Sequence, residues 1–132
     1  MIFVDTGAWF AVFVPNDSDC VAANAWLDAN TEPLITTDYV LDELFTLLKR
    51  RGEFSRAKEI GPPLLAGSIA GLESVSRADR EAAWDVFQAF EDKGWSFTDC
   101  TSRVVVQRLE IATAFAFDEH FRQFGTVTVV PA

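Results

Sequence analysis

The chain has 132 residues, of which 49% are hydrophobic, and its formal net charge at pH 7 is −9. This length and apolar content predict one folded domain over residues 1–132 and exclude a disordered chain, while no apolar run reaches the ~18 residues of a membrane span. The negative net charge argues against a protein that binds nucleic acid by net charge alone. Cys20 and Cys100 lack the C-x-x-C spacing of metal or redox sites, so we expect a reduced cytoplasmic protein.

The N-terminal half predicts two strands that alternate with two helices. Apolar runs, turn residues and helical spacing place these elements at 2–4 (strand), 17–30 (helix), 33–36 (strand) and 37–51 (helix). Thr37 is the expected cap of the last helix, and Gly52 stands where a C-terminal glycine belongs.

The C-terminal half continues the alternation. A helix starting near Ser55 meets Gly61-Pro62-Pro63, where the loss of helix hydrogen bonds predicts a break or kink before the helix resumes through Ala66. The later elements are a weak strand at 69–75, helices at 76–93 and 98–109, and strands at 113–117 and 126–130 with a short helical turn between them. Alternating strands and helices predict an α/β sandwich around a mainly parallel sheet.

Four acidic side chains lie in or directly after apolar runs. Asp5, Asp99 and Asp118 each end a strand-like run, where open parallel sheets collect ligand-binding groups. Glu43 lies at the edge of the apolar arc of its helix and is expected to be half-buried, whereas Asp42 falls on the solvated face. Each acid has an ordinary explanation: a turn for Asp5, a helix cap for Asp99 and Asp118, and a rim ion pair for Glu43.

The conjunction of the four acids is harder to explain in this way. If they converge on one pocket, their repulsion raises their pKa values and destabilises the fold unless a cation is bound. Carboxylate oxygens suit Mg²⁺ or Mn²⁺ better than zinc. His120 is the one histidine, which excludes a histidine-rich metal site and a two-histidine ribonuclease mechanism. We expect it to be a surface or loop residue rather than a catalyst.

Four segments, in order along the whole chain, resemble the PIN-domain nucleases and specifically the VapC toxins of toxin–antitoxin pairs. They are Val4-Asp5-Thr6, Leu41-Asp42-Glu43-Leu44, Ser96-Phe97-Thr98-Asp99-Cys100-Thr101-Ser102 and Ala116-Phe117-Asp118-Glu119-His120-Phe121. The resemblance implies a single PIN-like domain, an α/β/α sandwich with a mainly parallel central sheet. It also implies a metal-dependent endoribonuclease whose acidic quartet is Asp5, Glu43, Asp99 and Asp118.

The resemblance further implies the chemistry and the partners. One or two Mg²⁺ or Mn²⁺ ions would activate water and leave a 5′-phosphate and a 3′-hydroxyl, with Asp5 and Asp99 as direct ligands and Asp118 and Glu43 completing the site. Thr6, Thr98 and Thr101 align with hydroxyl positions near the site. RNA is the implied substrate, and a cognate antitoxin and a second copy in a homodimer are the implied partners.

Two questions stay open at this point. The basic residues of 49–58, and Arg103, Arg108 and Arg122, are candidates for RNA contacts, but scattered solvated charge explains them at least as well. A non-catalytic PIN-like interaction module is the alternative function. A receiver-type phosphoryl-transfer domain is disfavoured because no lysine follows Lys93.

Overall fold

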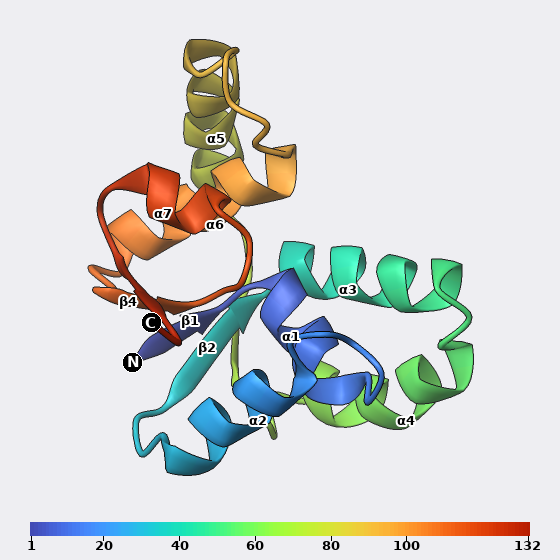
Figure 1. Cartoon of the computed structure of the whole chain (residues 1–132). Helices are drawn as coiled ribbons and strands as arrows, with labels where there is room; N and C mark the ends of the chain where they lie inside the picture. The colour runs from blue at the N-terminus through green and yellow to red at the C-terminus, as the bar shows by residue number, and fades with distance from the viewer.

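Five short strands form one parallel sheet in the order β3-β2-β1-β4-β5 in the computed structural model, which describes all residues 1–132 (Figure 1). The strands are β1 (Ile2–Val4), β2 (Leu34–Thr37), β3 (Gly71–Glu73), β4 (Thr113–Phe115) and β5 (Thr128–Val130). The helices are α1 (Thr6–Phe13), α2 (Cys20–Ala29), α3 (Asp38–Arg50), α4 (Phe54–Leu65), α5 (Arg77–Ala89), α6 (Phe97–Arg108) and α7 (His120–Phe124).

The strand β1 is the centre of the sheet. Its Ile2 is in register with Leu34 of β2 on one side and with Thr113 of β4 on the other. Phe3 and Val4 are fully buried, as expected of a parallel strand covered on both faces. The predicted α/β architecture is therefore confirmed.

The chain reverses its direction of travel through the sheet at β1. From β1 it steps outward to β2 and β3, and it then returns to β4 and β5 on the other side of β1. Right-handed crossovers then require the connecting helices to cover opposite faces, and Figure 1 shows α1 and α2 on one side of the sheet and α6 and α7 on the other. Such a reversal opens a crevice at the carboxyl ends of β1 and β4.

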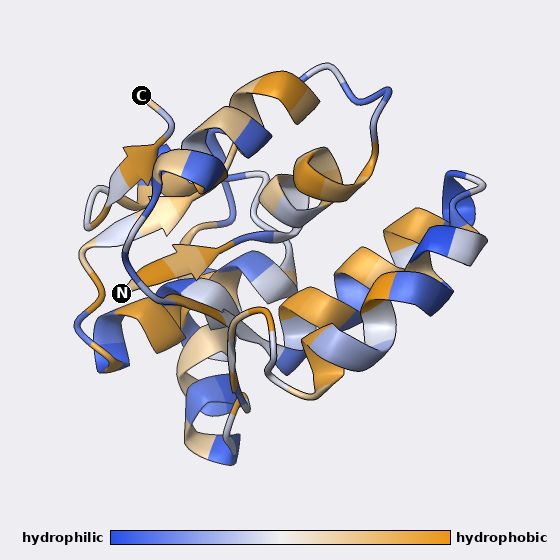
Figure 2. Ribbon diagram, turned by 90° about the horizontal axis from the view of Figure 1, so that it is seen from below, coloured by the Kyte–Doolittle hydropathy of each residue, from blue (hydrophilic) through white to orange (hydrophobic).

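The helices α3 and α4 pack against each other as an antiparallel pair that extends to one side of the sheet (Figure 1). Figure 2 shows hydrophobic and hydrophilic residues alternating along both helices, as amphipathic packing requires. Thr37 caps α3 by accepting a hydrogen bond from Val40 N at 3.1 Å, and Gly52 follows the helix with φ +76°. Both features were predicted.

One expected break is absent, and one helix was not foreseen. The break at Pro62 and Pro63 is absent, because α4 continues through both prolines to Leu65. The buried face of α4, including Ile60 and Leu64, holds the helix in place although two backbone donors are missing. The helix α1 was not predicted, because its sequence is apolar on nearly all sides and lacks an amphipathic period.

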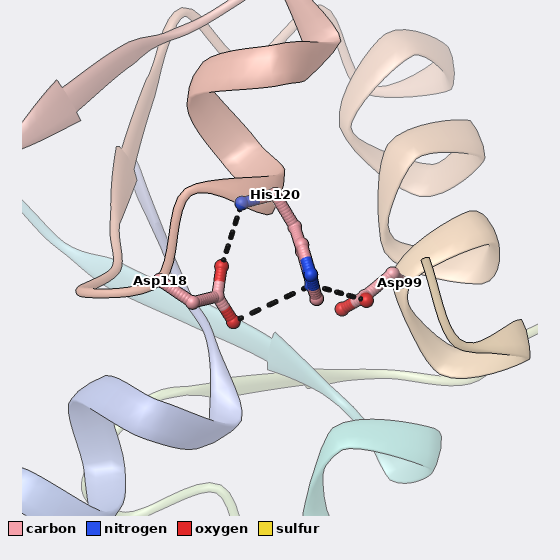
Figure 3. Close-up of side chains that lie close together, drawn as sticks. All are labelled: Asp99, Asp118 and His120. Carbon is pink, nitrogen blue, oxygen red and sulfur yellow. Dashed lines mark hydrogen bonds and ion pairs between the residues drawn. The ribbon is translucent and has the colours of Figure 1, made fainter. Parts of the chain in front are cut away.

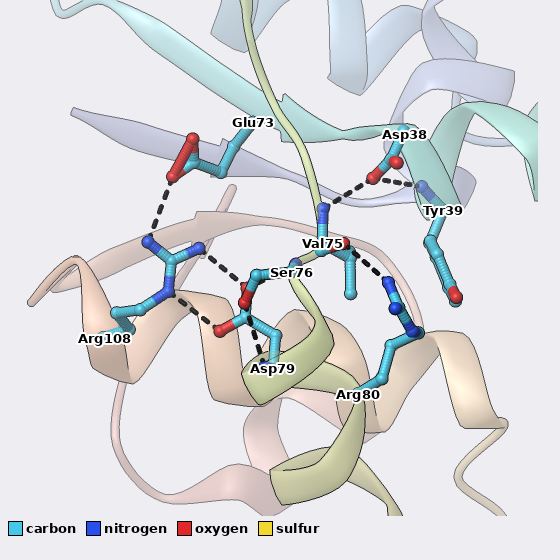
Figure 4. A network of polar contacts seen from close by, with 8 residues as sticks. All are labelled: Asp38, Tyr39, Glu73, Val75, Ser76, Asp79, Arg80 and Arg108. Carbon is cyan, nitrogen blue, oxygen red and sulfur yellow. Dashed lines mark hydrogen bonds and ion pairs between the residues drawn. The ribbon is translucent and has the colours of Figure 1, made fainter.

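A polar network joins α3, β3, α5 and α6 (Figure 4). Arg108, at the end of α6, donates hydrogen bonds of 2.8 Å to both carboxylate oxygens of Asp79 in α5 and one of 3.2 Å to Glu73 in β3. Asp38 of α3 accepts a 2.9 Å hydrogen bond from Val75 N in the β3–α5 connection. Arg108 therefore stabilises the helix that carries Asp99.

None of the seven helices combines the length and the hydropathy that crossing a membrane requires.

Candidate metal centre

Asp5 and Asp118 lie in the crevice where the chain reverses between β1 and β4. Asp5 follows β1 directly and precedes α1, and it is only 2% exposed. It occupies the N-cap position of α1, yet its side chain makes no cap hydrogen bond. Asp118 follows β4 by three residues and is exposed, with Oδ1 accepting a 3.0 Å hydrogen bond from His120 N. The carboxylate of Asp5 is thus buried without serving the helix that it begins.

Asp99 enters the crevice from the first turn of α6. Ser96, and not Thr98 or Asp99 as predicted, is the N-cap: Asp99 N donates to Ser96 Oγ at 3.0 Å. Ser96 N in turn donates to Asp99 Oδ2 at 2.9 Å, which completes a capping box. Asp99 is 4% exposed, and its Oδ1 accepts no hydrogen bond. One oxygen of this carboxylate is therefore held in place and the other is free for a ligand.

His120 joins two of the acids (Figure 3). Its Nδ1 lies 2.8 Å from Asp99 Oδ2 and 3.7 Å from Asp118 Oδ2, although it makes no hydrogen bond of regular geometry. Ligand atoms of the three residues lie within 4.8 Å of one another. The side chain is 27% exposed and stands at the start of α7, so the expectation of a surface or loop residue missed its place in the site. Its spacing of two from Asp118 was the available signal.

Glu43 reaches the site from α3. It is half-buried and Asp42 is exposed, as the helical arc of the sequence predicted. Burial raises the pKa of Glu43, with Asp99 and Asp118 adding to the increase, while hydroxyls of Thr6 and Thr98 oppose it. Glu43 also lines a surface hollow with Thr98, in the first turn of the helix that carries Asp99.

Neighbouring acids destabilise the charged forms of Asp5, Glu43 and Asp99. Burial raises the pKa of Asp5 well above its usual value, and the charges of Asp118, Asp99 and Glu43 raise it further. Burial also raises the pKa of Asp99, which Ser96 N and His120 partly oppose. The structure therefore gathers all four acids that the sequence singled out, and their mutual repulsion is the kind that a divalent cation relieves.

Two of the three predicted hydroxyls are placed to serve this site. The buried Oγ1 of Thr6 is close enough to Glu43 to lower the pKa of that acid, yet it makes no hydrogen bond of regular geometry. The hydroxyl of Thr101 instead donates to the backbone oxygen of Thr98 at 2.7 Å, inside its own helix. The carboxylate oxygens of this site and the orphaned buried hydroxyl of Thr6 fit a hard divalent cation, as the sequence suggested.

Two of the candidate RNA-binding residues, Arg103 and Arg108, contact other side chains of the protein. The guanidinium of Arg103 packs over the rings of Phe90 and Trp95, at 5.3 and 5.8 Å from their centroids, and does not contact Asp99. Arg108 belongs to the network with Asp79 and Glu73. Both side chains thus have partners within the protein, and their role as RNA contacts stays a prediction.

A model of the PIN domain matches residues 2–127 of the chain. The chain belongs to the PIN-domain family. Within it, the chain is 32% identical over 131 residues to the 23S rRNA-specific endonuclease VapC20 of Mycobacterium tuberculosis strain H37Rv, covering 99% of both proteins. It is 26% identical over 140 residues to ribonuclease VapC26 of the same strain, covering 98% of this chain and all of that protein.

Two solved structures agree with the fold. The crystal structure of M. tuberculosis VapC20, described as a sarcin-ricin loop cleaving toxin, superposes with a TM-score of 0.90 at 29% identity, over 96% of this chain and 97% of that one. FitAcB from Neisseria gonorrhoeae gives a TM-score of 0.69 at 14% identity over 98% and 96% of the two chains, which is a likeness of fold alone. The predicted family and the α/β/α PIN-like fold are confirmed.

Proposed function

We propose that this PIN-domain protein is a metal-dependent endoribonuclease, the toxin of a VapC-type toxin–antitoxin pair. The observation that carries the proposal is the cluster of Asp99, Asp118 and His120, whose ligand atoms lie within 4.8 Å of one another. Asp5 follows β1 at the same crevice, and Glu43 lines a hollow with Thr98 of the helix that carries Asp99. Their convergence in a chain that is similar to VapC20 over its full length supports a nuclease more strongly than either fact alone. A non-catalytic interaction module has no comparable need for repelling carboxylates, whose repulsion destabilises the fold.

The burial of the acids supports different roles in holding Mg²⁺ or Mn²⁺. Asp5 and Asp99 are buried, and each has a carboxylate oxygen that accepts no hydrogen bond, so they would contact the cation directly. Asp118 and Glu43, which are more exposed, would complete the site, and His120 would keep Asp99 and Asp118 in position. When bound, the cation supplies Lewis acidity that activates water and offsets the charge of the phosphate. Cleavage would leave a 5′-phosphate and a 3′-hydroxyl.

The substrate we propose is a loop of ribosomal RNA, met in the cytoplasm. VapC20, which this chain matches over 99% of its length, is named for 23S rRNA, and its structure is described as that of a sarcin-ricin loop cleaving toxin. Unstacked loop bases are also what proteins recognise most readily in RNA. A cognate antitoxin that blocks the crevice is the expected regulatory partner.

We also propose a homodimer, which an exposed aromatic surface on α5 supports. Trp84 and Phe87 are 52% and 41% exposed and stack on each other with ring centroids 5.7 Å apart. They line a hollow of about 660 Å³ that also contains Phe90 and Trp95. Replacing Trp84 by Ser should shift the protein toward monomer in sedimentation equilibrium. If the unaltered protein is already monomeric, the replacement will change nothing, and that result would contradict the dimer.

The proposed activity is tested by incubating ribosomes and total RNA with the purified, antitoxin-free protein. Reactions would contain Mn²⁺, Mg²⁺ or EDTA, and new 5′ ends would be mapped. Asp99→Asn should abolish discrete metal-dependent cuts, because the amide keeps the contact with Ser96 N but removes the charge. Asp28→Asn, an equivalent change at an exposed position of α2, is the matched control and should cleave normally. Cuts ending in a 2′,3′-cyclic phosphate would reject the mechanism, and no cuts by a folded, metal-loaded protein would favour the interaction module.

A further inference from the structure

Most basic side chains of this protein are already engaged. Ion pairs hold Arg56, Arg77, Lys93 and Arg108, aromatic rings lie under Lys49, Arg51 and Arg103, and Arg80 donates to a backbone oxygen. Of the eleven basic residues, Arg50, Lys58 and Arg122 have no such partner. A basic side chain without an ion pair, an aromatic contact or a hydrogen bond is therefore the exception in this acidic protein.

Arg50 shares a surface hollow with a residue of the acidic quartet. The hollow, of about 400 Å³, is lined by Asp42, Glu43, Thr46, Leu47 and Arg50 of α3 and by Thr98 of α6. Glu43 and Arg50 are seven residues apart, so they lie on the same face of α3, separated by about 10 Å along its axis. The hollow therefore runs from the metal centre to an unpaired guanidinium.

We propose that this hollow is the site through which the RNA backbone leaves the metal centre, and that Arg50 binds a phosphate on one side of the cleaved bond. The inference rests on the proposed nuclease function and assigns a substrate-positioning residue to it. A spacing of about 10 Å corresponds to roughly two to three nucleotides of a stacked strand. Arg50 would thus contact a neighbouring phosphate and not the one that is cleaved.

The chemistry of the lining fits a phosphodiester backbone. A guanidinium can donate two parallel hydrogen bonds to a phosphate, and the hydroxyls of Thr46 and Thr98 add short-range donors. The net charge of −9 and the exposed carboxylate of Asp42 repel RNA, so a backbone entering here needs a local cation beyond the metal. Arg50 is the one basic residue that lines this hollow.

The experiment compares Arg50→Gln with Lys58→Gln, which removes the same charge from another exposed, uncommitted cation on the adjacent helix α4. Binding of a fluorescent RNA hairpin to each full-length protein would be measured by anisotropy in Ca²⁺ at several salt concentrations. Arg50→Gln should raise Kd about tenfold and reduce the slope of log K against log salt by about one, because one phosphate contact is lost. Lys58→Gln should change both by much less.

Cleavage kinetics with Mn²⁺ separate positioning from chemistry. Arg50→Gln should raise KM about tenfold and leave kcat within about twofold, and Arg50→Lys should recover part of the loss. Equal effects of Arg50→Gln and Lys58→Gln on Kd, an unchanged salt slope, or no RNA binding by the unaltered protein would each overturn the inference. A protein that binds RNA through Arg50 but does not cleave it would instead contradict the proposed nuclease function and leave the binding site standing.

Discussion

Replacing Arg108 by Met tests whether the network of Figure 4 stabilises the fold. Asp79 is 2% exposed, and Arg108 donates a 2.8 Å hydrogen bond to each of its carboxylate oxygens. These hydrogen bonds hold the pKa of Asp79 below its usual value. Met preserves the helix propensity and much of the apolar stem of Arg108, so the substitution mainly leaves a buried carboxylate with only its contacts to Ser76.

The magnitude follows from burial. Breaking a fully buried ion pair costs about 3–5 kcal/mol, but the Arg108 side chain is 41% exposed and water screens part of the interaction. We therefore expect a loss of about 2–3 kcal/mol in the free energy of unfolding. With an unfolding entropy of about 2.1 cal/mol/K per residue, a chain of this length should lose about 7–11 °C in Tm.

Thermal unfolding followed by circular dichroism at pH 7 in EDTA is the assay. Arg77→Met, which breaks an exposed pair with Glu81 in α5, is the control and should lower Tm by less than about 2 °C. Because the folded pKa of Asp79 is lowered, its contribution is present above the unfolded value of about 3.8 and disappears as pH falls through the folded value. The difference between the two proteins should therefore shrink below about pH 4. A loss in Tm no larger than that of the control at pH 7 would refute the reasoning.

Three further predictions concern the metal centre. Folding raises the pKa values of Asp5, Glu43 and Asp99 above their unfolded values of about 4. The stability that these groups contribute is therefore fully present below about pH 4 and is lost as the pH rises through the folded pKa values. Calorimetry in EDTA should show the free energy of unfolding decreasing toward pH 7. Mn²⁺ should restore it, and an Asp5→Asn protein that keeps the full pH dependence would contradict this. Thr6→Val should leave Tm in EDTA within about 3 °C but lower kcat at least about tenfold, as measured by RNA cleavage, and normal kcat would remove the hydroxyl from the site. His120→Gln should weaken Mn²⁺ binding about 10-fold or more in titration calorimetry, with unchanged affinity counting against a positioning role.

Local rules located the elements that carry the site. The cap at Thr37 and the glycine after α3 depend on residues within one helical turn, and both are present. The burial of Glu43 and the exposure of Asp42 also followed from a helical period alone. Local signals failed where neighbouring elements outweigh them. The prolines of α4 remain helical because of packing, and the all-apolar sequence of α1 carries no period to detect.

The amino-acid sequence by itself determined the order of strands and helices and the four acids, because strand ends, caps and half-buried faces are properties of short segments. The tertiary structure alone decided what meets these acids. His120 contacts Asp99 across 21 positions, and Arg108 donates hydrogen bonds to Asp79 across 29. Arg50 lines the same hollow as Glu43. Side-chain partners separated by a crossover depend on how helices pack on opposite faces of the sheet, and no local pattern in the chain specifies that packing.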